Sequence, residues 1–172
     1  MKTKLFVATV LFTISEVAAA DQGQGRRDPQ CDSVPTQKER TARLQGRDPR
    51  AMEREGYPSD PNVVYQRAKE IGNMRDAWGA IIMVQEGVRT RRDLNRADEL
   101  WKDYWCSQVL PAFEDRPQIA FETLKAAAGR GLPSAIIRLS EVYATGEFGQ
   151  SVQQRLSVEW KNKYDATRAA KN

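Results

Sequence analysis

Histidine is missing from the 172-residue sequence, and cysteine occurs only twice. The lack of histidine removes the most frequent general base and the most frequent metal ligand of proteins. The sequence also lacks the Gly-x-Ser-x-Gly turn of serine hydrolases and the glycine loop that binds phosphates. We therefore expect no metal site, no cofactor and no catalytic residue, and we predict that the protein is not an enzyme.

Long apolar runs are scarce, and the main one, Leu5 to Ile14, follows Lys2 and Lys4 near the N-terminus. It is followed by small residues, with Ala18 and Ala20 placed as in a cleavage site. This layout predicts a secretory signal peptide over residues 1–20, a mature chain that begins near Asp21, and a periplasmic protein. The alternative is a weakly anchored N-terminal helix, although the run is short for a bilayer. No later stretch is typical of a transmembrane span.

An excess of charge of one sign is also missing. The formal net charge is +4, and removal of residues 1–20, which contain two lysines and one glutamate, leaves +3. Basic and acidic residues are interspersed along the predicted exported chain. This pattern indicates that the charges keep the protein soluble and do not form a surface that binds nucleic acid.

The two cysteines, Cys31 and Cys106, predict one disulfide, because an even number of thiols in an oxidising compartment is typical of a bridge. Closing so long a loop stabilises a protein by roughly 4 kcal/mol in the chain-entropy model. The alternative is a pair of free thiols. A catalytic cysteine is disfavoured, since no histidine is present to activate it.

The composition changes near Gly56. Residues 21–56 are polar and rich in Arg, Gln, Asp and Pro, and we expect them to form a mobile segment with one short helix in "PTQKERTARLQ". This segment is interpreted as a tether or as an arm that covers an edge, with ordering on a partner as the alternative. Residues 57–172 form the predicted helical domain.

Helix start and stop signals are dense after Gly56, and no alternating strand pattern is present, which predicts an all-α domain. The first helix begins at Pro61, with Ser59 or Asp60 as its N-cap, and ends near Gly72; the second ends at Gly87. The third is capped by Asp93 and ends before Pro111. The fourth is capped by Asp115, contains Pro117 in its first turn and ends at a left-handed Gly131. Two further helices lie in "LPSAIIRLSEVYATG" and "SVQQRLSVEWKNKYDATRA".

An internal repeat relates these helices. When the chain is shifted by 59 residues, Ala68 falls on Ala127, Gly72 on Gly131, Gly87 on Gly146 and Trp101 on Trp160. Small residues allow close helix approach, glycines supply turns, and the tryptophans fill the groove between helices. Copies of such a unit stack into a short α-solenoid of antiparallel helix pairs. The predicted structural residues are Ala68, Gly72, Gly87, Ala97, Trp101, Ala127, Gly131, Ala135, Leu139, Tyr143, Gly146 and Trp160.

Two stretches resemble the Sel1-like repeats, which are related to the tetratricopeptide repeats. "AAAGRGLPSAIIRLSEVYATG", from Ala126 to Gly146, is similar to the first part of the family pattern, and "EGVRTRRDLNRADELW", from Glu86 to Trp101, is similar to the second. Asp76 stands where the family has alanine, and Val84 where it has tyrosine; Val152 and Leu156 depart in the second copy. The resemblance implies a bacterial scaffold for protein–protein contacts, either an adaptor in envelope or secretion machinery or an immunity protein that neutralises a toxin such as a lipase.

Candidate partner contacts are the basic cluster Arg89, Arg91 and Arg92, together with Trp78 and Trp105. The cluster is interpreted as a solvated loop or as a contact to an acidic protein or anionic lipid. The two tryptophans are expected in the core or on an interaction surface.

The predicted function is a non-enzymatic periplasmic interaction module that binds another protein. An immunity protein is the alternative. A third hypothesis is a small envelope enzyme that uses paired carboxylates, for which the sequence offers Asp98 with Glu99 and Glu114 with Asp115.

Overall fold

The computed structural model describes residues 28–170, and within this range all regular secondary structure is helical, without a β-strand. The all-α prediction is therefore confirmed. The predicted signal peptide lies outside the described residues. Among the described helices, none combines the length and apolar character needed to cross a membrane.

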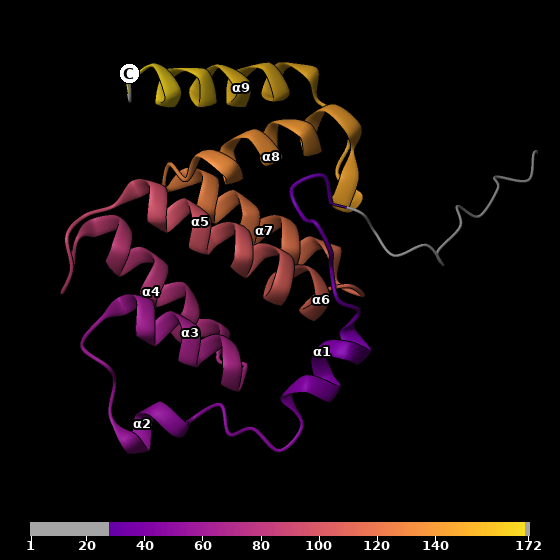
Figure 1. Ribbon diagram of the computed structural model, residues 1–172. Coiled ribbons are helices and arrows are strands. Elements are labelled where there is room, and N and C mark those ends of the chain that lie inside the picture. The colour runs from indigo at the N-terminus through magenta and orange to yellow at the C-terminus, as the bar shows by residue number, and fades with distance from the viewer. Residues whose placement is uncertain (1–27, 171–172) are drawn as a thin grey trace, which may run out of the picture.

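The helices follow one another with short connections (Figure 1). In chain order they are α1 (Gln37–Leu44), α2 (Ala51–Glu55), α3 (Pro61–Ile71), α4 (Met74–Glu86), α5 (Leu94–Tyr104), the π-helix η1 (Trp105–Val109), α6 (Leu110–Ala112), α7 (Pro117–Gly129), α8 (Pro133–Thr145), the 3₁₀-helix η2 (Glu147–Gly149) and α9 (Gln154–Ala169).

Successive helices pack side by side. The helix α3 packs on α4, α4 on α5, α5 on α8, and α8 on both α7 and α9 (Figure 1). The core lies between these helices and is built from alanine, leucine, valine and aromatic side chains. Helix α9 forms the outermost layer at one end, and α2 lies at the opposite end near α3.

The internal repeat coincides with matching local geometry. Helix α4 and helix α8 have bounds that differ by 59 at both ends. The turn glycines before them, Gly72 and Gly131, have φ of 75° and 85°, and the glycines after them, Gly87 and Gly146, both have φ of 77°. These left-handed values favour glycine because a β-carbon resists them. The predicted glycine stops are confirmed.

The helix-ending hydrogen bonds are repeated as well. The Asn73 N–H donates to the Ala68 carbonyl at 2.8 Å, and the Leu132 N–H donates to the Ala127 carbonyl at 3.4 Å. Both bonds satisfy carbonyl groups that a helix end would leave without a partner. Matching sequence in the two copies thus produces the same helix–turn–helix closure.

Two of the three predicted N-caps are confirmed. Asp60 accepts a hydrogen bond from the Asn62 N–H, and Asp93 accepts one from the Arg96 N–H. The prediction of Asp115 as a cap was wrong: Arg116 occupies the N-cap position of α7 without a side-chain cap bond. The Asp115 carboxylate lies 3.6 Å from Arg116 Nε, which is an alternative partner for it.

The predicted end of the third helix before Pro111 was also wrong. Helix α5 continues into η1, and α6 then includes Pro111. A proline inside a regular α-helix clashes with the carbonyl four residues earlier and lacks an N–H. The wider turn of η1, in which the Leu110 N–H donates to the Trp105 carbonyl, changes the register immediately before Pro111 and accommodates it.

From Asp28 onward, the polar segment that we expected to be mobile forms an arm along the helical domain (Figure 1). We call residues 28–57 the N-terminal arm. Its helix α1 begins with a capping box between Thr36 and Glu39 and packs on α6. Met52 of α2 is fully buried in the core. The arm therefore corresponds to the edge-covering interpretation of this segment.

Candidate functional site

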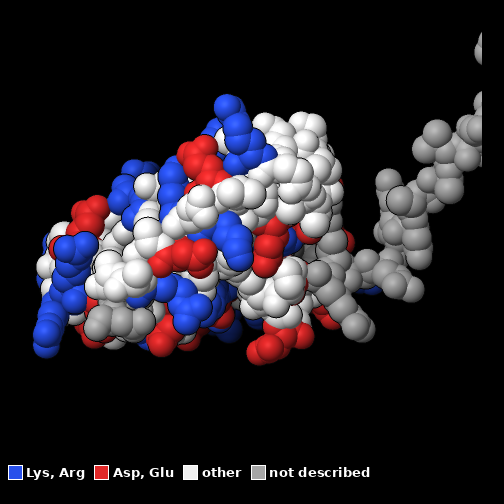
Figure 2. Space-filling view, turned by 90° about the horizontal axis from the view of Figure 1, so that it is seen from above, with Lys and Arg blue, Asp and Glu red and all other residues white. Residues whose placement is uncertain are grey.

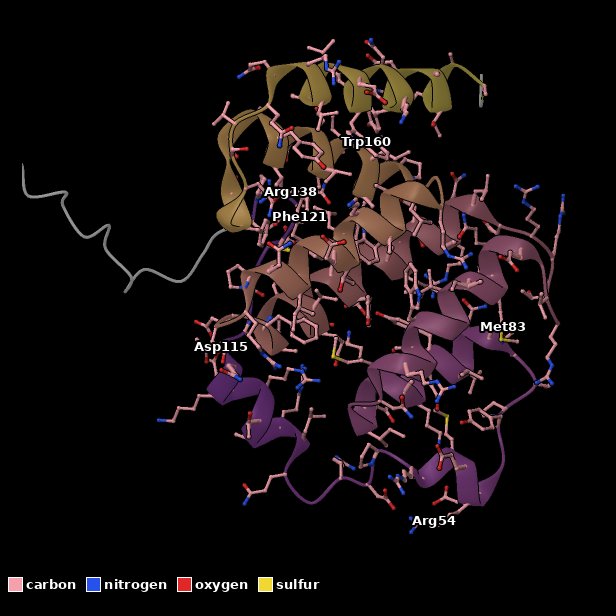
Figure 3. All side chains as sticks on the ribbon, turned by 180° about the vertical axis from the view of Figure 1, so that it is seen from behind. Arg54, Met83, Asp115, Phe121, Arg138 and Trp160 are labelled. Atoms are coloured by element: carbon pink, nitrogen blue, oxygen red, sulfur yellow. A yellow bond between two sulfur atoms is a disulfide. The ribbon has the colours of Figure 1, made fainter. Side chains whose placement is uncertain are left out.

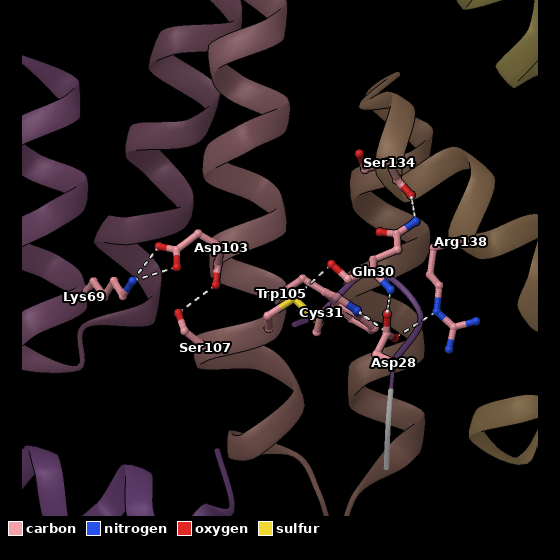
Figure 4. The surroundings of a disulfide bond; sticks show 10 residues. Asp28, Gln30, Cys31, Lys69, Asp103, Trp105, Ser107, Ser134 and Arg138 are labelled. Carbon is pink, nitrogen blue, oxygen red and sulfur yellow. Dashed lines mark hydrogen bonds and ion pairs between the residues drawn. A yellow bond between two sulfur atoms is a disulfide. The ribbon is translucent and has the colours of Figure 1, made fainter. Parts of the chain in front are cut away.

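The N-terminal arm is fastened to η1 by the disulfide Cys31–Cys106, which confirms the predicted pairing (Figure 4). The two Cα atoms are 5.7 Å apart. Cys106 lies within the π-helical turn, so the covalent tie is made where the helix register changes. This tie holds the residues on either side of Cys31 against α5, η1 and α8.

Asp28, three residues before Cys31, is the buried counter-ion of Arg138 from α8 (Figure 4). Arg138 Nε donates to Asp28 Oδ2 at 2.8 Å, and the two side chains are only 2% and 3% exposed. The indole N–H of Trp105 donates to the same carboxylate oxygen at 3.1 Å. Such a pair is stable only when both charges have partners, because burial of a lone charge is costly.

Two further carboxylates complete the shell around the Arg138 guanidinium. Glu147 from η2 forms an ion pair with it, and Glu141 Oε2 lies 3.4 Å from its terminal nitrogen. Burial works to lower the pKa of Arg138, but the hydrogen bond that it donates to Glu147 and the charge of Asp28 raise that pKa. Burial raises the pKa of Glu141, which Arg138 partly offsets.

Phe148 covers this cluster from the loop after α8. Its ring centroid lies 5.8 Å from that of Trp105 and 5.7 Å from the Arg138 guanidinium carbon. The ring is only 2% exposed, although its residue has a left-handed φ of 56°. We call the group formed by Asp28, Trp105, Arg138 and Phe148 the filled site.

The repeat places a counterpart of the filled site in the first copy. Arg89 occupies the position of Phe148 in the loop after α4 and has nearly the same φ, 57°. Gly79 occupies the position of Arg138, and a β-carbon added there would meet no atom within 4 Å. No aromatic ring from the loop and no long side chain from the helix therefore fills this position.

An apolar hollow remains in the first copy, and we call it the open hollow. Its walls come from the N-terminal arm, α3, α4 and the loop after α4; the lining residues are Tyr57, Val64, Asp76, Gly79, Ala80, Met83 and Arg89. Met83 marks this side of the molecule in Figure 3, and Arg138 marks the filled site on the other helix pair. Tyr57 is 48% exposed, and its hydroxyl donates to Asp76 Oδ2 at 3.0 Å.

The predicted basic cluster lies beside the open hollow. Arg89 lines the hollow itself, whereas Arg91 and Arg92 line a neighbouring polar hollow with Arg96. All three side chains of the cluster are exposed. Arg96 is paired with Glu99, but Arg89, Arg91 and Arg92 have no ion-pair partner among residues 28–170. The cluster is thus free to pair with carboxylates from outside.

The two tryptophans predicted as possible partner contacts have different positions. Trp105 is fully buried, so its assignment to an interaction surface was wrong; it packs 5.6 Å from the Trp101 ring. Trp78 is half-buried and stacks on Tyr104 at 6.1 Å. Only the outer edge of Trp78 is therefore available to a partner. Trp105 follows Trp101 by four residues, so the helical period places both rings on the same buried face.

The predicted structural residues are mostly buried. The fully or nearly fully buried ones are Ala68, Ala97, Trp101, Ala127, Ala135, Leu139 and Tyr143. Trp160 is only partly buried, with Lys163 Nζ 4.0 Å from its ring centroid. Helix α9 contains no fully buried residue. Figure 2 shows basic and acidic side chains mixed over the face that α9 forms.

The carboxylates proposed for an enzyme have structural partners. Asp98 accepts hydrogen bonds from the N–H and hydroxyl of Ser134 at 2.9 and 2.6 Å. Glu114 accepts one from the Gln37 N–H at 3.1 Å. Within the described part of the chain, no cluster of three or more His, Cys, Asp or Glu residues is placed to hold a metal ion.

Sequence reasoning did not find Asp28, Gly79 or Arg138. One signal was present: Arg138 interrupts the apolar face formed by Ala135, Leu139 and Val142, and a charge on such a face requires a buried partner. The partner itself lies 110 positions away, and no local pattern marks it.

Comparison with known proteins gives no assignment, since no family model, no curated protein and no solved structure matches the chain.

Proposed function

We propose that this protein is an exported, non-enzymatic interaction module, built as a short helical solenoid with diverged Sel1-like copies. The observation that carries the proposal is the repeated geometry: α4 and α8 have equivalent bounds, equivalent left-handed glycines and equivalent closing hydrogen bonds. Stacked helix pairs of this kind present extended surfaces and commonly bind other proteins.

The ends of the helical array favour binding along its side. The N-terminal arm covers α3, where Leu44 lies against Gly72 and Met52 is buried. Helix α9 presents a polar, mixed-charge face at the other end (Figure 2). Polar terminal layers keep repeat arrays soluble and stop their extension. The exposed cluster of Arg89, Arg91 and Arg92 lies between these ends and is therefore the contact that we propose.

Export agrees with the cysteine pairing. The Cys31–Cys106 disulfide closes a loop of 75 positions. Disulfides persist mainly in oxidising compartments, such as the bacterial periplasm. Together with the N-terminal pattern of residues 1–20, the disulfide supports a periplasmic protein.

A non-enzymatic role is supported by the carboxylates. Arg138 is surrounded by the carboxylates of Asp28, Glu141 and Glu147. The carboxylate of Asp103 forms an ion pair with Lys69 Nζ at 2.7 Å. General acid–base catalysis needs a titratable group within reach of substrate, and these groups are committed to internal partners.

The proposal is tested by capture from the periplasm. The full chain, tagged at its C-terminus, is produced in its host, cross-linked and purified, and a tagged unrelated periplasmic protein serves as the control. We expect one protein to be retained specifically and to bind the purified chain directly by calorimetry. The activity of that partner separates an adaptor from an immunity protein. Turnover of envelope substrates by the purified chain, without any retained protein, would contradict the proposal.

A further inference from the structure

We infer that the open hollow and the basic loop beside it form a docking site for an acidic segment of another protein that carries an aromatic side chain. This inference rests on the proposed function, because it names the chemistry of the partner. The evidence comes from a comparison of the two repeat copies, which differ in what fills equivalent positions.

The second copy shows what the equivalent position accommodates. Phe148 buries its ring beside Trp105 and the Arg138 guanidinium, and Asp28 supplies a carboxylate to the same arginine. A ring and a carboxylate therefore occupy the filled site together. Both come from this chain.

The first copy has the same backbone conformation as the second, but it lacks the two side chains that fill the second copy. Arg89 has the left-handed conformation of Phe148, but its side chain is exposed, and Gly79 leaves open space where Arg138 stands. The walls that remain are largely apolar, with Val64, Ala80 and Met83 among them. An aromatic side chain from outside can lie here as Phe148 lies in the second copy.

The charges around the open hollow favour an aromatic side chain that is flanked by acidic residues. Arg89 borders the open hollow, and Arg91 and Arg92 follow it in the same exposed loop, all without ion-pair partners among the described residues. Arginine pairs with carboxylates through two parallel hydrogen bonds, which favours an acidic partner. The carboxylate of Asp76 already accepts hydrogen bonds from Tyr57 and Asn73, so it does not compete for the arginines.

A protein segment fits this surface better than a membrane does. The aromatic side chain must enter a hollow bounded by the N-terminal arm, α3 and α4, which one side chain of a peptide can do. A flat bilayer surface also cannot fill the space left at Gly79. Binding to anionic lipid is therefore an opposing outcome in the test.

The test uses the full mature chain and a fluorescein-labelled peptide in which one phenylalanine is flanked by aspartates. Two matched peptides carry serine in place of the phenylalanine or lysine in place of the aspartates. We expect only the first peptide to bind, with chemical-shift changes at the amides of Gly79, Ala80 and Arg89. Affinity should fall as salt rises, because the arginine contacts are exposed.

Gly79→Leu fills the open hollow, and Gly129→Leu is its control, since both glycines lie in helices with open space at the β-carbon. We expect Gly79→Leu to lower the affinity for the first peptide by about tenfold or more. That is the scale of the binding free energy of one buried apolar side chain. Gly129→Leu should bind like the wild type. Melting temperatures confirm that both variants fold.

Further variants distinguish the contribution of the arginine charges to binding from the contribution of the hollow's shape. Replacement of Arg89, Arg91 and Arg92 by glutamine should weaken binding, whereas the same change at Arg155, Lys161 and Arg168 of α9 should not. Arg89→Phe copies the second repeat and should occupy the open hollow with the chain's own ring, which keeps the test valid if Gly79→Leu fails to fold.

Several results would overturn the inference. These are equal binding by Gly79→Leu and the wild type, equal binding of the serine peptide, or shifts confined to other surfaces. Arginine-dependent sedimentation with phosphatidylglycerol vesicles, without peptide binding, would assign the loop to lipid instead. If the partner captured from the periplasm binds Gly79→Leu as well as the wild type, the interaction function stands and only this site is wrong. If no partner is captured, the peptide titration still decides the chemistry of the hollow.

Discussion

Arg89 and Phe148 share a left-handed backbone conformation, with φ of 57° and 56°, at equivalent positions of the two repeat copies. Such a conformation costs roughly 1–2 kcal/mol for a residue with a β-carbon. Only Phe148 offsets this cost by burying its ring, since it is 2% exposed. The backbone is thus a property of the repeat, whereas the side chain determines whether the site is filled.

Substitutions at these two positions should have opposite effects. Phe148→Ala should lower the free energy of unfolding by about 3–5 kcal/mol, because it empties a packed position. Arg89→Gly should leave that free energy unchanged or raise it by up to about 1 kcal/mol, because glycine tolerates the left-handed backbone. Urea denaturation measures both. A loss of stability in Arg89→Gly similar to that in Phe148→Ala would show that the loops are not equivalent.

The Asp28–Arg138 pair should be essential to folding. Asp28→Asn should lower the free energy of unfolding by about 3–5 kcal/mol, since it removes the one fully buried counter-charge among the three carboxylates around Arg138. Asp48→Asn is the control: its ion pair with Arg54 is exposed, so its loss should cost less than about 1 kcal/mol. A double-mutant cycle with Arg138→Met should give a coupling energy above about 1 kcal/mol. Additive effects would argue against the pair.

Loss of the disulfide should weaken the attachment of the N-terminal arm. The Cys31→Ser, Cys106→Ser double variant should lose about 4 kcal/mol, which corresponds to a melting temperature lower by roughly 8–16 °C. Protein isolated without reductant should contain no free thiol when unfolded and should migrate faster on a non-reducing gel than on a reducing one. A reactive thiol at each cysteine would contradict the bridge.

The two repeat tryptophans should differ in their contribution to stability. Trp101→Ala should lower the free energy of unfolding by about 3–5 kcal/mol, because Trp101 is fully buried. Trp160→Ala should cost about 1–2 kcal/mol, because this ring on α9 stays partly hydrated. Circular dichroism melts compare them. Equal losses would mean that the Trp160 ring is packed as completely as the Trp101 ring.

Alkaline pH should destabilise the protein through its buried tyrosines. Burial raises the pKa of Tyr104 from 10.0 to about 12, and burial with the Asp103 hydrogen bond also raises the pKa of Tyr65. Between these pH values the unfolded chain releases the Tyr104 proton and the folded chain keeps it. Stability is therefore complete below pH 10 and falls as the pH rises to about 12. The loss from Tyr104 is roughly 3 kcal/mol.

Ultraviolet absorbance of tyrosinate measures this titration. The exposed Tyr57 should ionise before the protein unfolds, although its hydrogen bond to Asp76 raises its pKa. Tyr65 and Tyr104 should ionise only together with the loss of helix. Ionisation of all the tyrosines in one step near their ordinary pKa, with helix retained, would contradict the burial of these two side chains.

The sequence by itself determined the helical class, most helix boundaries and the correspondence between the copies. Asp60 and Asp93 act within one turn of their own helices, and Gly72 and Gly87 end helices through their own backbone conformation. These are local effects, so they can be recognised from neighbouring residues. The cysteine pair was also predictable, because only one intramolecular pairing exists for two cysteines.

The tertiary structure alone decided the composition of the two sites. Asp28 and Arg138 meet across 110 positions, and neither residue's neighbours reveal the other. The π-turn at Trp105–Val109 carries the helix through Pro111. Burial of a charge or a ring depends on how distant helices pack around it, and that packing free energy is shared among many side chains. For this reason spacing predicted the repeat, while only the packed structure distinguished the filled site from the open hollow.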